Sequence, residues 1–116
     1  MDEVELKRRT KAFGLRALRL VEVLPNSRTG RIASDQLGRS ATSVGANYRA
    51  SCRARSRAEF LSKLGNVEEE ANESCFWLEI IIESGLMPAK KVTARLNEGN
   101  QLVAIIFASR RTVKGR

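Results

Sequence analysis

Basic side chains gather near both ends of the 116-residue sequence, where they could bind phosphate groups. They are Lys7, Arg8, Arg9 and Lys11 at one end, and Arg110, Arg111 and Lys114 at the other. Several cationic side chains acting together bind a nucleic-acid backbone strongly, and this binding is salt-sensitive and independent of base sequence. No aromatic residues are interleaved with these charges, so stacking on single-stranded bases is poorly supported. We take these residues as the candidate nucleic-acid-binding site; the alternative is a solvated basic end that only aids solubility.

The residue types that catalyse reactions or hold metals are scarce in this chain. It contains no histidine, which removes the usual general base near neutral pH and the ligands that zinc and di-iron helix bundles need. Cys52 and Cys75 are interpreted as buried free thiols. We therefore expect a protein that is not an enzyme and that has no metal and no cofactor.

Acidic residues are concentrated in one segment of an otherwise basic chain. The net charge is +8, yet residues 57–84 contain seven glutamates against Arg57 and Lys63. Such a segment needs basic partners within the molecule or between subunits. Arg53, Arg55 and Arg57 therefore have two interpretations, contact with phosphate or pairing with these glutamates, and we favour pairing.

The elements that must position these residues are helices. Apolar residues recur every three to four positions in four stretches, which predicts helices over about residues 4–24, 28–54, 57–84 and 88–113 of a single domain, residues 1–116. Three short connections then give an all-α, antiparallel, up-down-up-down four-helix bundle. In this topology the first helix begins and the fourth ends at the same pole, so the two basic clusters should coincide in space.

Local signals set the helix ends. Pro25 should end the first helix. Ser56 and Glu59 form a capping box that should begin the third, and Gly85 should end it. Pro88 should sit in the first turn of the fourth helix, and Gly99 should weaken its middle, where we expect a kink or local mobility.

The second helix is unusual because a face of mostly small residues lies next to its apolar face. One face carries the apolar positions Ile32, Leu37, Ala41, Val44 and Tyr48. Ser40, Ser43, Gly45 and Asn47 are interpreted as helix-packing or interface residues, because no general base accompanies them. Phe76 and Trp77 lie beside the apolar stripe of the third helix, and they are either core edge or subunit interface.

Residues 24–25, 35–49, 52–60, 63–65, 69–74 and 77–79 carry a family resemblance. Together they resemble the bacterial four-helix-bundle proteins also called 23S rRNA intervening-sequence proteins, or S23-like proteins. The resemblance spans about residues 13–86, with a compatible fourth helix. Ala50 departs from the pattern, since many members carry glutamate or a related residue near this position.

The resemblance implies a ring-like homopentamer of four-helix bundles. It also implies similarity to the accessory variability protein of diversity-generating retroelements, a basic pentameric barrel associated with reverse transcriptase and nucleic acid. The ribosomal label of the family reflects genes that lie inside insertions in ribosomal RNA, and the activity of its members is not established.

Two functions follow as expectations. The first is a non-enzymatic homopentamer that binds RNA, DNA or a nucleoprotein through its basic surface. The second is a protein-interaction scaffold for an acidic partner such as a polymerase. We expect a cytoplasmic protein without a membrane partner or small-molecule substrate, because the sequence has no signal-peptide layout and no apolar run near 18 residues.

Overall fold

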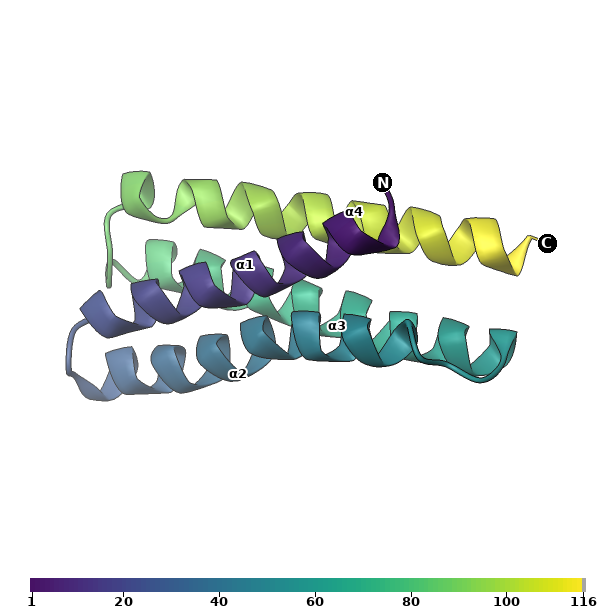
Figure 1. Ribbon diagram of the computed structural model, residues 1–116. Helices are drawn as coiled ribbons and strands as arrows, with labels where there is room; N and C mark the ends of the chain where they lie inside the picture. Colours follow the sequence, from purple (N-terminus) through teal and green to yellow (C-terminus); the bar gives the residue numbers. More distant parts are fainter. Residues whose placement is uncertain (116) are drawn as a thin grey trace.

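The computed structural model describes residues 1–115 and confirms the predicted all-α four-helix bundle (Figure 1). The elements are α1 (Glu3–Val23), α2 (Arg28–Ser51), α3 (Arg57–Glu83), a short 3₁₀ turn η1 (Ala89–Lys91) and α4 (Thr93–Lys114). The bundle measures 47 × 20 × 19 Å. No helix within residues 1–115 combines the length and apolarity needed to cross a bilayer.

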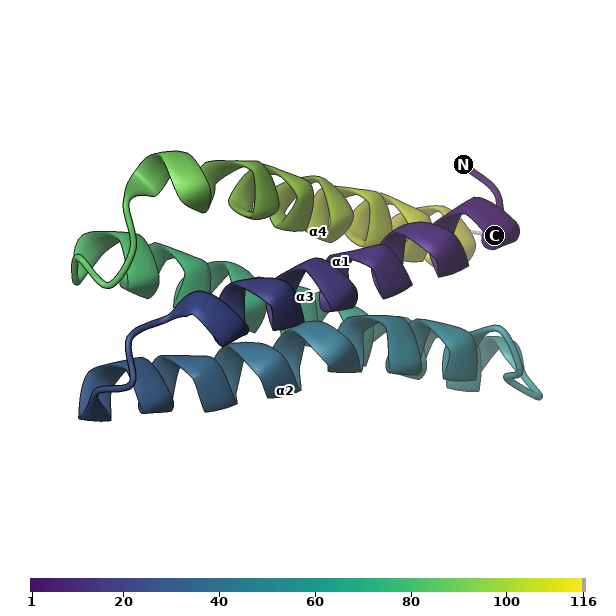
Figure 2. The same cartoon turned by 60° about the vertical axis from the view of Figure 1, so that its left-hand side comes forward.

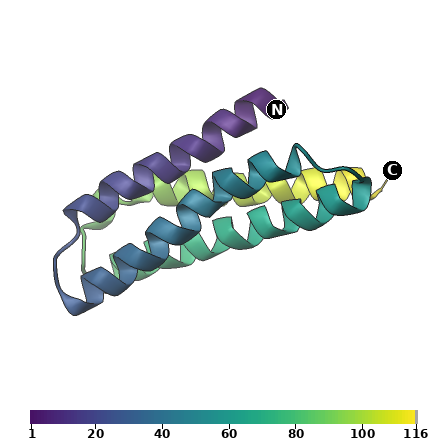
Figure 3. The ribbon, with the colours of Figure 1, turned by 60° about the horizontal axis from the view of Figure 1, so that its bottom comes forward.

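Consecutive helices are antiparallel neighbours, and α1 and α4 form the loosest pair (Figures 2 and 3). The start of α1, the end of α4 and the α2–α3 connection lie at one pole of the bundle, as the topology predicts (Figures 1 and 3). Polar contacts join the loose pair. Arg95 Nε donates to the carbonyl oxygen of Arg16 at 3.1 Å, and Arg9 pairs with Glu98.

The apolar stripes predicted for the helices form the core, with one exception. Leu37, Val44 and Leu78 are fully buried. We placed Ile32 on the buried stripe of the second helix. This prediction is wrong, since 52% of the Ile32 surface is exposed. It lies five residues before Leu37, whereas Ala33 lies four before it and turns inward instead.

The α1–α2 contact depends on two glycines. A Cβ atom on Gly45 would lie 3.3 Å from the backbone of Thr10 and Lys11, and one on Gly14 would lie 3.2 Å from the carbonyl oxygen of Ala41. Side chains at either position would hold the two backbones apart. The small residues of the second helix therefore permit the close packing that the sequence predicts.

Both ends of α3 follow the predicted signals. Ser56 Oγ accepts from the Glu59 amide at 3.1 Å, although the Glu59 carboxylate accepts from the Arg55 amide at 3.3 Å instead of closing the predicted box. Gly85 adopts a φ of 78°, a conformation that glycine tolerates without strain. The amides of Gly85 and Leu86 then satisfy carbonyl groups of the last helical turn.

The fourth helix differs from the prediction at two points. It begins at Thr93, because Pro88 is extended and leads into η1, and Val92 (φ −119°) breaks the helix while burying its side chain fully in the core. Helix α4 runs without interruption through Gly99, where we expected a kink or local mobility, and the local mobility stays a prediction. A Cβ atom there would lie 2.7 Å from Cys75 Sγ, so Gly99 serves close packing of α3 on α4.

Candidate nucleic-acid interface

Five basic side chains line one hollow on the surface between α1 and α2, here called the basic hollow. The lining residues are Lys7, Arg8 and Lys11 of α1, with Arg49 of α2 and Arg53 just beyond its end. On α1, Lys7 and Lys11 lie one turn apart, which places them about 6 Å apart along the helix axis. Among the described residues, no carboxylate and no aromatic side chain lines this hollow.

Intramolecular pairing of these cations is slight. Arg8 Nε donates to Glu5 Oε2 at 3.0 Å, and this hydrogen bond raises the pKa of Arg8 and lowers that of Glu5. Lys7 Nζ lies 3.9 Å from a Glu3 oxygen, at exposed positions where such pairs contribute little. Lys11, Arg49 and Arg53 form no ion pair with any residue in 1–115.

Arg9, although adjacent to Arg8, lies apart from this hollow. Its guanidinium donates to both oxygens of Glu98, at 3.0 and 2.7 Å, and to Gln101 Oε1 at 3.1 Å. Its side chain is only 15% exposed, and the hydrogen bond to Glu98 raises its pKa. Arg9 therefore ties α1 to α4 and presents little charge to a ligand.

The C-terminal basic residues share the pole of the basic hollow but do not line it. Arg110 Nη1 lies 2.5 Å from Glu68 Oε1, and its guanidinium packs against Gly65 of α3. The Arg111 guanidinium lies 5.8 Å from the centre of the Phe107 ring, within range of a cation–π contact. Lys114 is exposed in the last turn of α4. The N-terminal cluster instead joins Arg49 and Arg53, and Arg49 is a residue that the sequence analysis missed.

Arg49 could have been found from its spacing. It precedes Arg53 by four residues, which places both on one side of the helix. What the sequence could not reveal is the rotation of α2 that turns this pair toward Lys7 and Lys11.

Within residues 1–115 of one subunit, Arg57 pairs with no glutamate and instead contacts the end of α4. Its Nη2 donates to the carbonyl oxygens of Val113 and Lys114, the latter at 3.0 Å. These are carbonyls of the last turn of α4, which accept no hydrogen bond from an amide four residues further along the helix. Arg57 therefore caps α4 from the start of α3. The structure gives Arg53 and Arg55 no ion pair within the described residues.

The acidic face of α3 is paired inside the subunit, with arginines other than those expected. Arg39 of α2 bridges Glu70, at 3.2 Å, and Glu73. The hydrogen bond to Glu73 is the main cause of the raised pKa of Arg39. With the Arg110–Glu68 pair, these contacts clamp α3 between α2 and α4.

The small polar residues of α2 mainly serve packing. Ser74 Oγ donates to Ser40 Oγ at 3.0 Å, in a fully buried contact between α3 and α2. Ser43 Oγ donates to the carbonyl oxygen of Arg39 within its own helix at 2.7 Å, and Asn47 is half-buried. These residues surround no general base, which agrees with a structural role.

The two aromatic residues singled out on α3 differ in exposure. Trp77 packs against the core, whereas 53% of the Phe76 surface is exposed. Their rings stand edge to face, 5.3 Å apart at an angle of 83°. Trp77 thus supports an aromatic ring that projects from the bundle.

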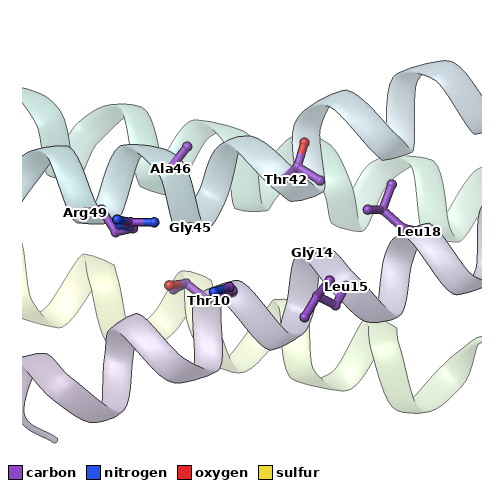
Figure 4. A pocket seen from close by; sticks show the side chains of 9 residues that line it. Thr10, Gly14, Leu15, Leu18, Thr42, Gly45, Ala46 and Arg49 are labelled. Atoms are coloured by element: carbon purple, nitrogen blue, oxygen red, sulfur yellow. The ribbon is translucent and has the colours of Figure 1, made fainter.

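A second hollow, here called the apolar hollow, lies beside the first between α1 and α2 (Figure 4). Its volume is about 230 Å³. It is lined by Thr10, Lys11, Gly14, Leu15, Leu18, Thr42, Gly45, Ala46 and Arg49. Leu15 and Leu18 are 47% and 41% exposed. Lys11 and Arg49 border both hollows, so the α1–α2 face is apolar on one part and basic on the next.

The carboxylate and thiol side chains of the described residues are dispersed, and the two thiols are protonated. No group of three or more cysteine or carboxylate side chains in this part of the chain could hold a metal ion. Burial raises the pKa of Cys75 to about 11 and also raises that of Cys52, so both thiols are protonated and weakly nucleophilic at neutral pH.

Comparisons with known proteins agree on one family. The family described as 23S rRNA-intervening sequence protein matches residues 2–108. The chain is also similar to a crystal structure from Bacteroides thetaiotaomicron, a protein with unknown function from the S23 ribosomal protein family. The two share 30% identity, the match covers 96% of this chain and 99% of that one, and the TM-score is 0.88. No curated protein matches the sequence.

Proposed function

This chain belongs to the 23S rRNA-intervening sequence protein family, and from that premise we propose that it is a non-catalytic, self-assembling protein that binds RNA or DNA along its basic hollow. One observation carries the proposal: five cations, from α1, α2 and the residues just beyond α2, line a single hollow to which residues 1–115 contribute no carboxylate. Three of these cations form no ion pair within residues 1–115. The phosphates of a nucleic-acid backbone would supply the anions that these cations lack.

The chemistry of the basic hollow favours contact with phosphate over reading of bases. The ammonium groups of Lys7 and Lys11, about 6 Å apart along α1, suit successive phosphates on a strand. No aromatic side chain lies in the lining to stack on a base. Binding should therefore be strongly salt-dependent and indifferent to sequence.

Self-assembly as a homopentamer is the second part of the proposal and is supported by the family resemblance. Exposed apolar side chains on both sides of the bundle, Leu15 and Leu18 on α1 and Phe76 on α3, also favour contact between copies. A closed ring would repeat the basic hollow around one pole. Linked copies of a weak phosphate site then bind a long polyanion far more tightly than one copy does.

The test is binding of RNA and DNA duplexes of equal length, measured by fluorescence anisotropy. We expect the triple variant Lys7→Gln, Arg8→Gln, Arg53→Gln to lose at least tenfold in affinity for both duplexes. The matched control is Arg28→Gln, Lys90→Gln, Lys91→Gln, which removes the same charge from exposed residues at the opposite pole. Equal loss in both variants, or no binding by the wild type at low salt, would overturn the proposal.

A second candidate function is a scaffold that binds an acidic partner protein. The observation that favours it is the apolar hollow, whose lining includes the two basic residues Lys11 and Arg49. Capture of partners from lysate with and without nuclease separates the two functions. A protein partner that survives nuclease treatment supports the scaffold, whereas nuclease-sensitive material alone supports nucleic-acid binding.

A further inference from the structure

We propose that copies of this chain dock head to tail, with Phe76 on α3 of one copy inserted into the apolar hollow between α1 and α2 of the next. This inference rests on the self-assembly in the proposed function and names the two surfaces that make the contact. Lys11 and Arg49, which border both hollows, then lie at the contact between copies, and Lys7, Arg8 and Arg53 of each copy stay outside it and remain available to nucleic acid.

The receiving surface is the apolar hollow. Its floor is low because Gly14 and Gly45 carry no side chains, and Leu15 and Leu18 rise beside it with 47% and 41% of their surfaces exposed (Figure 4). The Lys11 and Arg49 side chains add positive charge to its lining. A single-copy molecule would leave these leucines in contact with water, at a cost that burial removes.

The inserting surface is the outer stripe of α3. Five exposed residues follow one another at helical spacing along this stripe: Glu69, Asn72, Phe76, Glu79 and Glu83. Phe76 is the single apolar member, and Trp77 supports its ring. None of the three glutamates forms an ion pair with a residue in 1–115, although Glu68, Glu70 and Glu73 beside them do.

The two surfaces are complementary in shape and in charge. One presents an apolar depression with cations in its lining, and the other presents one aromatic ring with carboxylates before and after it along the helix. Glu79 lies one turn beyond Phe76, so a ring seated in the hollow brings this carboxylate near Lys11 and Arg49. An aromatic anchor in a pocket with complementary charge around it is typical of protein–protein interfaces.

The surfaces face different ways, which determines the kind of assembly. Phe76 shares a surface depression with Asn100 of α4, so the inserting stripe borders the α3–α4 face, whereas the apolar hollow lies on the α1–α2 face. Because each helix packs beside the next one around the bundle, the α1–α2 face and the α3–α4 face lie on opposite sides of it. A contact between unlike faces is heterologous, and it produces a ring or a filament instead of a two-fold dimer.

Two variants that each damage one surface test the proposal. Leu18→Arg damages the hollow and Phe76→Glu damages the inserting stripe, and both positions are exposed, so the fold should persist by circular dichroism. We expect light scattering to give a multimer for the wild type and a monomer for each variant. The control Ile32→Arg changes an apolar residue that is 52% exposed but lies outside the hollow, and it should keep the wild-type mass.

Mixing the two variants gives the decisive result. The Leu18→Arg copy still has an intact Phe76, and the Phe76→Glu copy still has an intact hollow. Head-to-tail docking therefore predicts a one-to-one heterodimer and nothing larger. Two monomers that stay separate on mixing, or single variants that keep the wild-type mass, overturn the docking inference.

A charge exchange provides a second test that does not depend on the apolar residues. Arg49→Glu and Glu79→Arg should each weaken assembly at least tenfold, and both changes in one chain should restore it. A double variant as weak as either single one would count against the contact. A wild type that is a monomer would overturn self-assembly itself, whereas nucleic-acid binding is tested separately through Lys7, Arg8 and Arg53.

Discussion

At the scale of single residues, small side chains determine how closely the helices approach. Gly45 lies against the backbone of α1, and Ser40 lies close enough to α3 to accept a hydrogen bond from Ser74. The sequence indicated these roles because small residues in a helix with poor intrinsic propensity imply close neighbours. It could not indicate which neighbour each residue meets, since that depends on how far each helix is rotated.

We expect Gly45→Val to destabilise the protein by about 1–3 kcal/mol, the usual cost of overpacking a contact between two backbones. The new side chain would push against Thr10 and Lys11, whose backbone atoms lie 3.3 Å from the position of a Cβ atom. Urea denaturation followed by circular dichroism measures the change.

The matched control is Gly38→Ala on the same helix. The nearest atom to a Cβ there is the flexible end of Leu18, at 3.8 Å. Alanine should fit and stabilise the helix by about 0.4–1 kcal/mol. If both substitutions act in the same direction, the close α1–α2 contact is not what determines the residue at position 45.

The buried thiol of Cys75 makes stability depend on pH in the alkaline range. Burial raises its pKa to about 11, with a further contribution from Glu79, so the unfolded chain releases this proton at a lower pH than the folded chain does. The free energy of unfolding should therefore decrease as the pH rises from about 9 toward about 11.

Urea denaturation at about pH 8 and about pH 10.5 under reducing conditions checks this prediction. Burial also raises the pKa of Tyr48, which acts in the same direction, so the comparison is with Cys75→Ala. We expect the variant to lose less stability between the two pH values than the wild type. An identical loss in both proteins would show that the thiol contributes nothing.

At the scale of helices, the sequence predicted the elements well and their ends less well. Apolar periodicity identifies four helices because each buries one stripe against its neighbours. The start of α4 was misplaced because burial of Val92 outweighs the preference of Pro88 for a first helical turn. Ile32 was misplaced because an apolar residue at the edge of a stripe can equally well face water.

The contact of Arg57 with the end of α4 is a helix-level feature that spacing alone could not reveal. We expect Arg57→Ala to leave the carbonyls of Val113 and Lys114 without this donor, and the last turn of α4 to fray. Hydrogen–deuterium exchange should then be faster in residues 108–114 and unchanged in α2.

Arg55→Ala is the control, because its side chain makes no hydrogen bond or ion pair within the described part of the chain. It removes the same charge from the same connection. Equal acceleration of exchange in both variants would attribute the effect to charge and not to the cap.

At the scale of the whole molecule, some surfaces carry paired charges and others carry charges without an ion-pair partner in the described residues. The acidic side of α3 that faces α2 and α4 is neutralised internally by Arg39 and Arg110. Within residues 1–115, Lys11, Arg49 and Arg53 on the α1–α2 face and the glutamates of the outer stripe of α3 form no ion pair. The charge totals predicted both an acidic segment and a basic remainder, but only the folded arrangement separates paired from available charge.

The salt dependence of nucleic-acid binding is the most direct test of the basic hollow. Each phosphate contact contributes about 0.7–0.9 to the slope of the logarithm of affinity against the logarithm of salt concentration. Lys7→Gln, Arg8→Gln, Arg53→Gln should therefore reduce the magnitude of that slope by about two to three, with the assembled mass unchanged. An unchanged slope would contradict the account, because these cations would then not be where the nucleic acid binds.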